Sequence, residues 1–111
     1  MARARYRVLL TLGAERDLAA IYDYGAKSDG PARADIVPGD LMGVVGRLSE
    51  FPERGPHPAE LAVLGIRDFR QTVFTPYRVI YRVIARKVYF FVIADGRRDM
   101  QSLLAQRLLK S

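Results

Sequence analysis

The chain has 111 residues, half of them apolar, a formal net charge of +6 and no cysteine. This size and composition predict one folded domain over residues 1–111, which removes roughly two-thirds of its unfolded surface from water. A sequence without cysteine has no disulfide, no thiol catalysis and no thiolate metal site.

The positive charge is concentrated in the second part of the chain. Residues 1–64 carry eight Lys/Arg and nine Asp/Glu, whereas residues 65–111 carry ten and three. Fifteen of the 18 basic residues are Arg, which can bind a carboxylate or a phosphate at two points. A GC-rich genome would also favour Arg over Lys, so the uneven placement is the stronger indication of an acidic protein or nucleic-acid partner.

The beginning of the chain predicts a short strand and then a helix. Arg5 to Leu10 reads as the strand, and Thr11 can cap the helix that follows. The apolar positions of this helix, spaced at a helical period, are Ala14, Leu18, Ile21, Tyr22 and Gly25. The segment Ser28–Pro31 ends the helix, and Pro31 can open the next one.

The second helix is expected to be irregular. Its apolar face, which closes near Phe51-Pro52, consists of Leu41, Val44, Val45 and Leu48. Because a proline removes a hydrogen bond and clashes with the preceding turn, Pro38-Gly39 predicts a kink or two pieces, the longer starting near Pro38. The proline-rich segment Pro52–Glu60 follows as a loop.

The single histidine, His57, lies in this loop between two prolines. We expect it to be an exposed loop residue rather than a ligand, and we expect no metal and no cofactor. The N-terminus is basic but has no apolar run of signal-peptide length, and the longest apolar stretch, Val88 to Ala94, is too short to span a bilayer. The prediction is a soluble cytoplasmic protein without membrane contact.

Three strand-like runs then predict an antiparallel meander, and they are Ile66–Phe74, Tyr77–Ile84 and Val88–Ile93. In the third run, simple alternation places Val88, Phe90 and Val92 on one face. Neither connection between the runs contains glycine, so we expect loops of three to five residues rather than two-residue turns.

The middle run separates basic from aromatic side chains. Alternation places Arg78 and Arg82 on one face, and Tyr77 and Tyr81 on the other. The two arginines are expected to line a partly covered groove with their stems against apolar residues. A simple solvated edge is the alternative.

After the sheet, Asp99 can cap a final helix. The apolar positions of this helix are Met100, Leu103, Leu104 and Leu108, with Leu109 off that face. One side of a sheet cannot cover all these leucines, so we expect Leu109, with Met100, in an exposed apolar patch that binds a partner. Arg97 and Arg98 precede the helix, where they favour an anion, although Arg97 can instead pair with Asp95 or Asp99.

The predicted fold is α+β. An N-terminal strand and an antiparallel helical hairpin pack on a mainly antiparallel sheet, whose three-stranded C-terminal meander is followed by a short helix.

The run from Pro76 to Met100, PYRVIYRVIARKVYFFVIADGRRDM, followed by LLAQRLL, resembles the C-terminal half of toxins of the RelE/ParE superfamily. The Y-R-V-x-Y-x-V strand, the G-[RK]-R turn and the F-P-x-x-G ending of the helical hairpin (Phe51–Gly55) carry the resemblance. It covers Tyr6 to Leu109 and implies a type II toxin–antitoxin toxin, held by an acidic and partly disordered antitoxin. Growth arrest and plasmid stabilisation are the roles that this implies.

The superfamily divides into RelE-like ribosome-dependent mRNA endonucleases and ParE-like inhibitors of DNA gyrase. For the endonuclease reading, the resemblance implies Arg78 and Arg98 as phosphate-binding residues, with Arg70 the basic residue on the first strand of the meander. The position of the expected catalytic tyrosine holds Leu104, and no Tyr or His follows Gly96. Arginine is a poor proton shuttle, so the sequence favours the gyrase inhibitor, without catalytic residues and without enzyme activity.

The alternatives are the mRNA endonuclease, with ribosome and mRNA as its target, and a degenerate toxin without activity. In either case the expected partner-binding residues are Arg78, Arg82, Arg97, Arg98, Met100, Leu104, Leu108 and Leu109.

Overall fold

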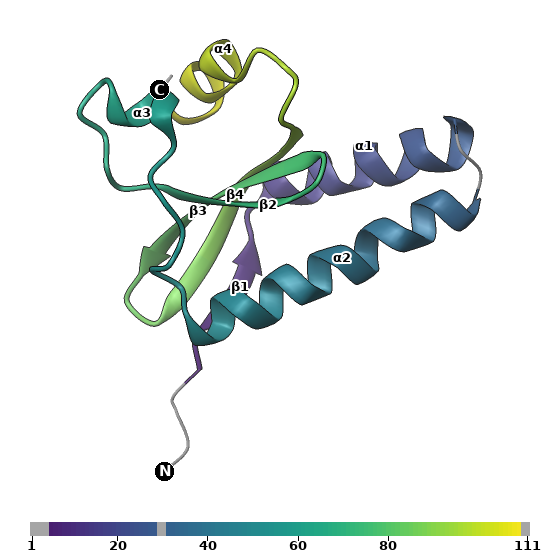
Figure 1. Cartoon of the computed structure of the whole chain (residues 1–111), viewed down its shortest axis with the longest axis horizontal. Coiled ribbons are helices and arrows are strands. Elements are labelled where there is room, and N and C mark those ends of the chain that lie inside the picture. The colour runs from purple at the N-terminus through teal and green to yellow at the C-terminus, as the bar shows by residue number, and fades with distance from the viewer. Residues whose placement is uncertain (1–4, 29–30, 110–111) are drawn as a thin grey trace.

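The computed structural model describes residues 5–28 and 31–109, and for residues 24–28 and 31–40 it describes the backbone alone (Figure 1). A four-stranded sheet lies at its centre, in the order β1 (Arg7–Leu10), β4 (Lys87–Asp95), β3 (Tyr77–Ile84) and β2 (Arg70–Phe74). β1 runs parallel to β4, and the other neighbours are antiparallel. The predicted α+β fold is therefore confirmed.

Helices cover both faces of the sheet (Figure 1). The hairpin of α1 (Leu12–Ser28) and α2 (Pro31–Glu50) lies on one face. The short helices α3 (Ala59–Ala62) and α4 (Met100–Leu104) lie on the other, and α4 continues into a π-helical turn, η1 (Ala105–Leu109). No helix among the described residues is both long enough and apolar enough to cross a membrane.

Each face of the sheet has its own apolar core. Under the hairpin, residues of α1 and α2 pack against residues of β3 and β4. The buried residues of this core include Ala14, Val44, Leu48, Val79, Tyr81, Val88 and Phe90. Under α3 and α4 the core is formed by Leu61, Phe69, Ile80, Val92, Ala94, Met100 and Leu104. The sheet is thus buried on both faces, which explains the density of β-branched and aromatic residues in its central strands.

A β-bulge at Phe91 overturns the expected alternation in β4. Ile80 pairs with Val92 and Tyr81 pairs with Phe90, so Phe91 has no partner in β3. A bulge inserts one extra residue and shifts the phase of the side chains beyond it. Val92 therefore packs under α3 and α4, whereas Phe90 packs under the hairpin.

The prediction of three- to five-residue loops between the strands of the meander was wrong. Phe74 pairs with Tyr77 and Ile84 pairs with Lys87, so each connection is a two-residue turn. Ala85 adopts a positive φ of 56°, a conformation that glycine would reach more easily, and the Thr75–Pro76 peptide bond is cis. The first strand of the meander begins at Arg70 rather than Ile66.

The second helix is one element and is not split at Pro38-Gly39, contrary to the alternative of two pieces. A proline removes one hydrogen bond of the helical ladder, and the remaining turns continue on both sides of it. Pro31 opens this helix, as predicted. Thr11 caps α1, since its hydroxyl accepts a hydrogen bond from the Ala14 amide at 3.3 Å.

The proline-rich loop is shorter than predicted, because α3 begins at Ala59. His57 is half-buried in this loop rather than exposed. Its Nδ1 lies 3.0 Å from the carbonyl oxygen of Phe69, to which it donates a hydrogen bond. His57 thus fastens the loop to the segment that enters β2.

Candidate partner-binding surface

Arg78 lies on the face of β3 that α3 and α4 cover, and its guanidinium is fully engaged within the chain. Two of its nitrogens donate to the carboxylate of Glu60 on α3, each at 2.8 Å. The Gln71 side-chain oxygen on β2 accepts two further hydrogen bonds from Arg78. Gly96 packs against the stem, where a Cβ would lie 3.2 Å from the Arg78 Cγ and Cδ atoms. The strand arginine is therefore a bound side chain that joins α3 to the sheet.

The Arg78–Glu60 pair is shielded from water on both sides. The two side chains are 16% and 22% exposed. The hydrogen bonds from Arg78 hold the pKa of the Glu60 carboxyl below its usual value, in spite of the opposing effect of burial. The Glu60 carboxyl is therefore ionised at neutral pH, and its pairing with Arg78 has the strong bidentate geometry.

Tyr81 points away from Arg78, into the core under the helical hairpin. Its side chain is fully buried, and its hydroxyl accepts a hydrogen bond from the Gly55 amide at 3.2 Å. Burial raises the pKa of the phenol above its usual value. The separation of Tyr81 from the strand arginines is as predicted.

Arg70 and Arg82, the other arginines of the meander, also contact neighbouring residues. Arg70 donates to the carbonyl oxygen of Gly55 at 2.8 Å, which makes it a support of the loop after α2. Arg82 lies 3.4 Å from a carboxylate oxygen of Asp68, with its guanidinium 6.0 Å from the ring centroid of Phe69. The Arg82–Asp68 pair is largely exposed, so Arg82 can exchange this partner for another at little cost.

The turn before α4 presents two arginines in different states. Arg97 forms a two-point ion pair with Asp95, at 3.0 and 2.6 Å, and these hydrogen bonds lower the pKa of Asp95 to about 2. Asp99 accepts from the Ser102 amide and caps α4, as predicted. The Arg98 side chain is exposed and makes no hydrogen bond or ion pair with the described residues. Arg98 is thus available to a partner.

The apolar residues predicted to bind a partner divide into core and surface. Met100 and Leu104 are 3% and 0% exposed and belong to the core, so the expected exposure of Met100 is wrong. Leu108 packs at the border of this core, and Leu109 is 41% exposed. The exposed apolar surface of the C-terminal turn therefore centres on Leu109.

Sequence reasoning missed an ion pair that fastens the C-terminal turn to α1. Arg107 donates to both carboxylate oxygens of Asp17, at 2.9 and 3.0 Å. The same two side chains bind the backbone of β4, where Asp17 accepts from the Ile93 amide and Arg107 donates to the Phe91 carbonyl oxygen. Because β1 pairs only with Lys87–Phe90, this ion pair closes the edge of β4 that β1 leaves open.

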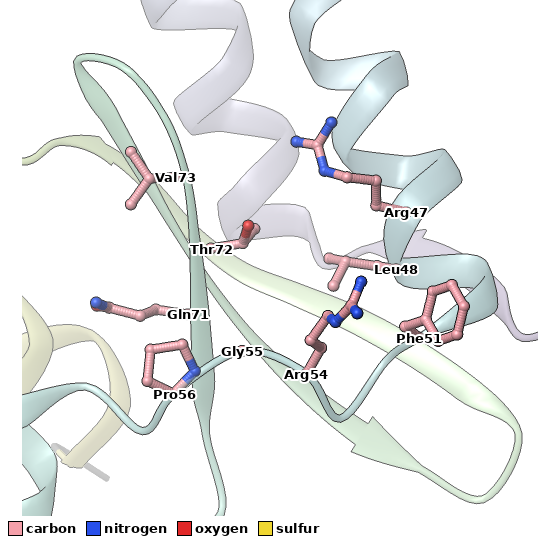
Figure 2. Close-up of a pocket in the computed structure, with 9 residues that line it drawn as sticks. All are labelled: Arg47, Leu48, Phe51, Arg54, Gly55, Pro56, Gln71, Thr72 and Val73. Atoms are coloured by element: carbon pink, nitrogen blue, oxygen red, sulfur yellow. The ribbon is translucent and has the colours of Figure 1, made fainter.

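A hollow of about 310 Å³, here called the β2 groove, lies between α2 and the outer edge of β2 (Figure 2). Its lining comes from the end of α2, the following loop and β2, and consists of Arg47, Leu48, Phe51, Arg54, Gly55, Pro56, Gln71, Thr72 and Val73. Figure 2 shows Arg47 and Leu48 projecting from α2 towards β2, with Arg54 rising from the loop beside Leu48. The β2 groove therefore has an apolar floor and two cationic groups.

We find no candidate metal site among the described residues. No three His, Asp or Glu side chains converge there in a way that could hold a metal ion. The carboxylates of Asp17, Glu60 and Asp95 are each bound by an arginine instead.

Comparisons with known proteins identify the sequence family of this chain and solved structures that share its fold. The family model of the ParE toxin of the type II toxin–antitoxin system, parDE, matches residues 8–100. No curated protein sequence matches the chain.

Two solved structures share the fold. The chromosomal ParDE toxin–antitoxin system from P. aeruginosa contains a chain 22% identical in sequence, with a TM-score of 0.68 over 84% of this chain and 98% of that one. A chain of the RelBE2 toxin–antitoxin complex from Mycobacterium tuberculosis is 23% identical, with a TM-score of 0.59 over 85% and 94% of the two chains. At such identities the likeness shows the fold alone.

Proposed function

The chain belongs to the ParE toxin family of type II toxin–antitoxin systems, and from this we propose that it arrests growth by binding and inhibiting DNA gyrase. We also propose that a cognate antitoxin with an acidic segment binds the toxin and neutralises it. The observation that carries the choice of target is the Arg78–Glu60 pair, because it occupies the strand arginine that a ribonuclease would need for phosphate. A phosphate would have to displace a carboxylate bound at two points.

The placement of proton-transfer groups also argues against RNA cleavage. Attack by the 2′-hydroxyl needs one group that takes a proton and another that gives one. The Tyr81 hydroxyl is buried on the opposite face of the sheet, and the His57 Nδ1 is occupied by the Phe69 carbonyl. Neither is hydrogen-bonded to an arginine of the meander in the described structure. This arrangement supports binding rather than catalysis.

The residues that we propose for partner binding come from β3, the turn before α4 and the final turn of the chain. They are Arg82, Arg97 and Arg98, together with Leu108 and Leu109 of the final turn. Arg82 has an exposed guanidinium group in a single surface pair with Asp68, and Arg97 has an exposed guanidinium group in a two-point pair with Asp95. Arg98 has no ion pair among the described residues. Exposed arginines and exposed apolar side chains are both enriched in protein-binding surfaces.

A supercoiling assay tests the proposal. Purified toxin added to gyrase and relaxed plasmid at near-stoichiometric amounts is expected to abolish supercoiling, and the purified antitoxin is expected to restore it. Gyrase that stays fully active at an excess of folded toxin would overturn the proposal.

Two further measurements separate the alternatives. Primer extension on translated mRNA after induction is expected to show no new cleavage ends, and new ends would favour the ribosome-dependent endonuclease. Growth is expected to stop on induction, and growth that continues would indicate an inactive toxin.

A further inference from the structure

We propose that a partly open area of the sheet, here called the open strip, binds single-stranded DNA. Its six residues come from β1, β3 and β4, and they are Arg7, Leu9, Arg82, Ile84, Lys87 and Tyr89. They lie at the end of the sheet that carries the β3–β4 turn, and in Figure 1 this end is remote from α3 and α4. Binding of a DNA strand goes beyond gyrase inhibition, and only the choice of DNA over RNA rests on the proposed function.

Strand register brings the six side chains together in two neighbouring rows. In the first row, Lys87 of β4 lies between Arg7 of β1 and Ile84 of β3. In the second row, Tyr89 of β4 lies between the remaining strip residues of β1 and β3. Because the two rows are two positions apart along each strand, their side chains point to the same face of the sheet.

This face of the sheet is the one on which α3 and α4 lie. The neighbouring residues Val8, Val83 and Val88 pack under the helical hairpin on the opposite face. Side chains alternate along a strand, so the strip residues face the other way. The apolar members of the open strip belong to neither of the two cores, and Ile84 is 43% exposed. α3 and α4 therefore leave this part of their own face of the sheet partly open.

The charges of the open strip are not neutralised within the described structure. Arg7 and Lys87 are exposed and lie opposite each other in the β1–β4 ladder, and neither side chain forms an ion pair with a described residue. Like charges opposite each other in a sheet lower its stability, and a bound phosphate would relieve this repulsion. The third cation, Arg82, has only its exposed pair with Asp68.

Tyr89 distinguishes the open strip from a simple basic patch. It is half-buried in a central strand, outside both cores, and its ring forms no aromatic pair with a described residue. An aromatic ring on a sheet surface, with cations around it, is the arrangement on which bases of single-stranded nucleic acids stack. From the strand spacing and the rise per residue, Arg7 and Arg82 are about 12 Å apart with Tyr89 between them. Phosphates on the two sides of a base stacked on Tyr89 can thus each meet a guanidinium group.

Two other ligands fit this arrangement less well. The bases of duplex DNA are stacked inside the double helix, so they cannot reach the ring of Tyr89. An acidic peptide would meet the three cations, but it would bring no base to the ring. The combination of an unpaired aromatic ring and unneutralised cations therefore favours a single strand.

The choice of DNA over RNA follows from the proposed target and from the polar groups of the open strip. DNA gyrase acts on DNA, and a toxin that holds a DNA strand beside gyrase would contact the enzyme and its substrate together. RNA-binding surfaces also contact 2′-hydroxyl groups. The only uncharged polar side-chain group of the open strip is the Tyr89 hydroxyl.

Fluorescence anisotropy of the full chain with a labelled oligothymidylate tests the charges. The double variant R7E/K87E is expected to weaken binding at least about tenfold, and to flatten the slope of log K against log salt concentration by about 1.4, since each lost phosphate contact removes ~0.7. The control R16E/R47E makes an equal charge change at two exposed arginines of the helical hairpin, and it is expected to weaken binding less than about threefold. Melting temperatures show that each variant is folded.

The aromatic ring is tested by separate substitutions. Tyr89→Leu removes the ring and keeps an apolar side chain, so it is expected to weaken binding at least about fivefold. Tyr89→Phe keeps the ring and is expected to bind within about twofold of the unaltered chain. Tyr22→Leu, at a tyrosine of α1 that is 43% exposed, is the matched control and should leave binding unchanged.

Three competing ligands complete the test. The duplex of the same sequence and a polyglutamate peptide are expected to bind at least about fivefold more weakly than the single strand, and an oligouridylate no more tightly. Equal binding by Tyr89→Leu and the unaltered chain, tighter binding of any of the three competitors, or no binding of the oligothymidylate would overturn the inference. None of these measurements contains gyrase, so such a result would leave the proposed gyrase inhibition standing, which the supercoiling assay tests by itself.

Discussion

Asp17 and Arg107 are joined by two hydrogen bonds, at 2.9 and 3.0 Å, although 90 positions of sequence separate them. The side chains are 18% and 26% exposed, and each also binds a backbone group of β4. One ion pair thus connects α1, the sheet and the C-terminal turn.

Asp17→Ala is expected to lower the free energy of unfolding by about 2–3 kcal/mol, because it leaves Arg107 without its counter-charge and the Ile93 amide without its acceptor. Chemical denaturation measures the change. Asp23→Ala, an exposed position of the same helix, is the control and should change stability by less than about 0.5 kcal/mol. A similar small effect for both variants would show that the ion pair contributes little.

Two glycine substitutions are expected to have opposite signs. At Gly55 a Cβ would lie 2.3 Å from the Gln71 carbonyl oxygen and 2.5 Å from the Tyr81 hydroxyl, so Gly55→Ala must move backbone and should cost about 2–3 kcal/mol. At Gly46, within α2, nothing lies within 4 Å of the added methyl group. Gly46→Ala should therefore stabilise the protein by about 0.5–1 kcal/mol, through helix propensity. Thermal and chemical unfolding of both variants measure the difference, and equal effects would contradict the close approach at Gly55.

The residue pattern of the meander predicted much of the fold. A sheet that is buried on both faces needs apolar residues at both the odd and the even positions of its strands, and the strands of the meander have them. This pattern placed Arg78 opposite Tyr81, as the structure has them. It failed at Phe91, since a bulge leaves no mark in a run that is apolar throughout. It also failed at Ala85, whose positive φ allows a two-residue turn without the usual glycine.

The candidate site was predictable only in part, for a different reason. Arginines that can bind anions were visible in the sequence, but their partners within the chain were not. Glu60 lies 18 positions before Arg78, on a helical turn that was predicted as loop. No rule of local spacing predicts a contact between two such residues. From the sequence alone, Arg78 was therefore expected to be free to bind an external phosphate.

The Glu60 carboxylate is expected to make stability depend on pH. Its pKa in the folded protein is lowered from the ordinary 4.5, chiefly by the hydrogen bonds from Arg78. A lowered folded-state pKa contributes stability that is present above pH 4.5 and is lost as the pH falls through the folded value.

Unfolding measured between pH 6 and pH 3 should therefore show a larger loss for the unaltered protein than for Glu60→Gln. Asp95 and Asp99 also have lowered pKa values, but they are present in both proteins and cancel in the comparison. Identical pH profiles of the two proteins would mean that the Arg78–Glu60 pair does not contribute to folding.

Arg98 provides the sharpest test of the partner-binding surface, because changing it should affect function without affecting the fold. Its side chain is exposed and makes no hydrogen bond or ion pair with the described residues, so Arg98→Glu should shift the melting temperature by no more than about 1 °C. If Arg98 contacts gyrase, the charge reversal should raise the toxin concentration needed for half-inhibition of supercoiling by about tenfold or more. Arg16→Glu, at an exposed position of α1, is the matched control and should leave inhibition unchanged. Full inhibition by folded Arg98→Glu would remove Arg98 from the proposed contact and move the search to Arg82 and Leu109.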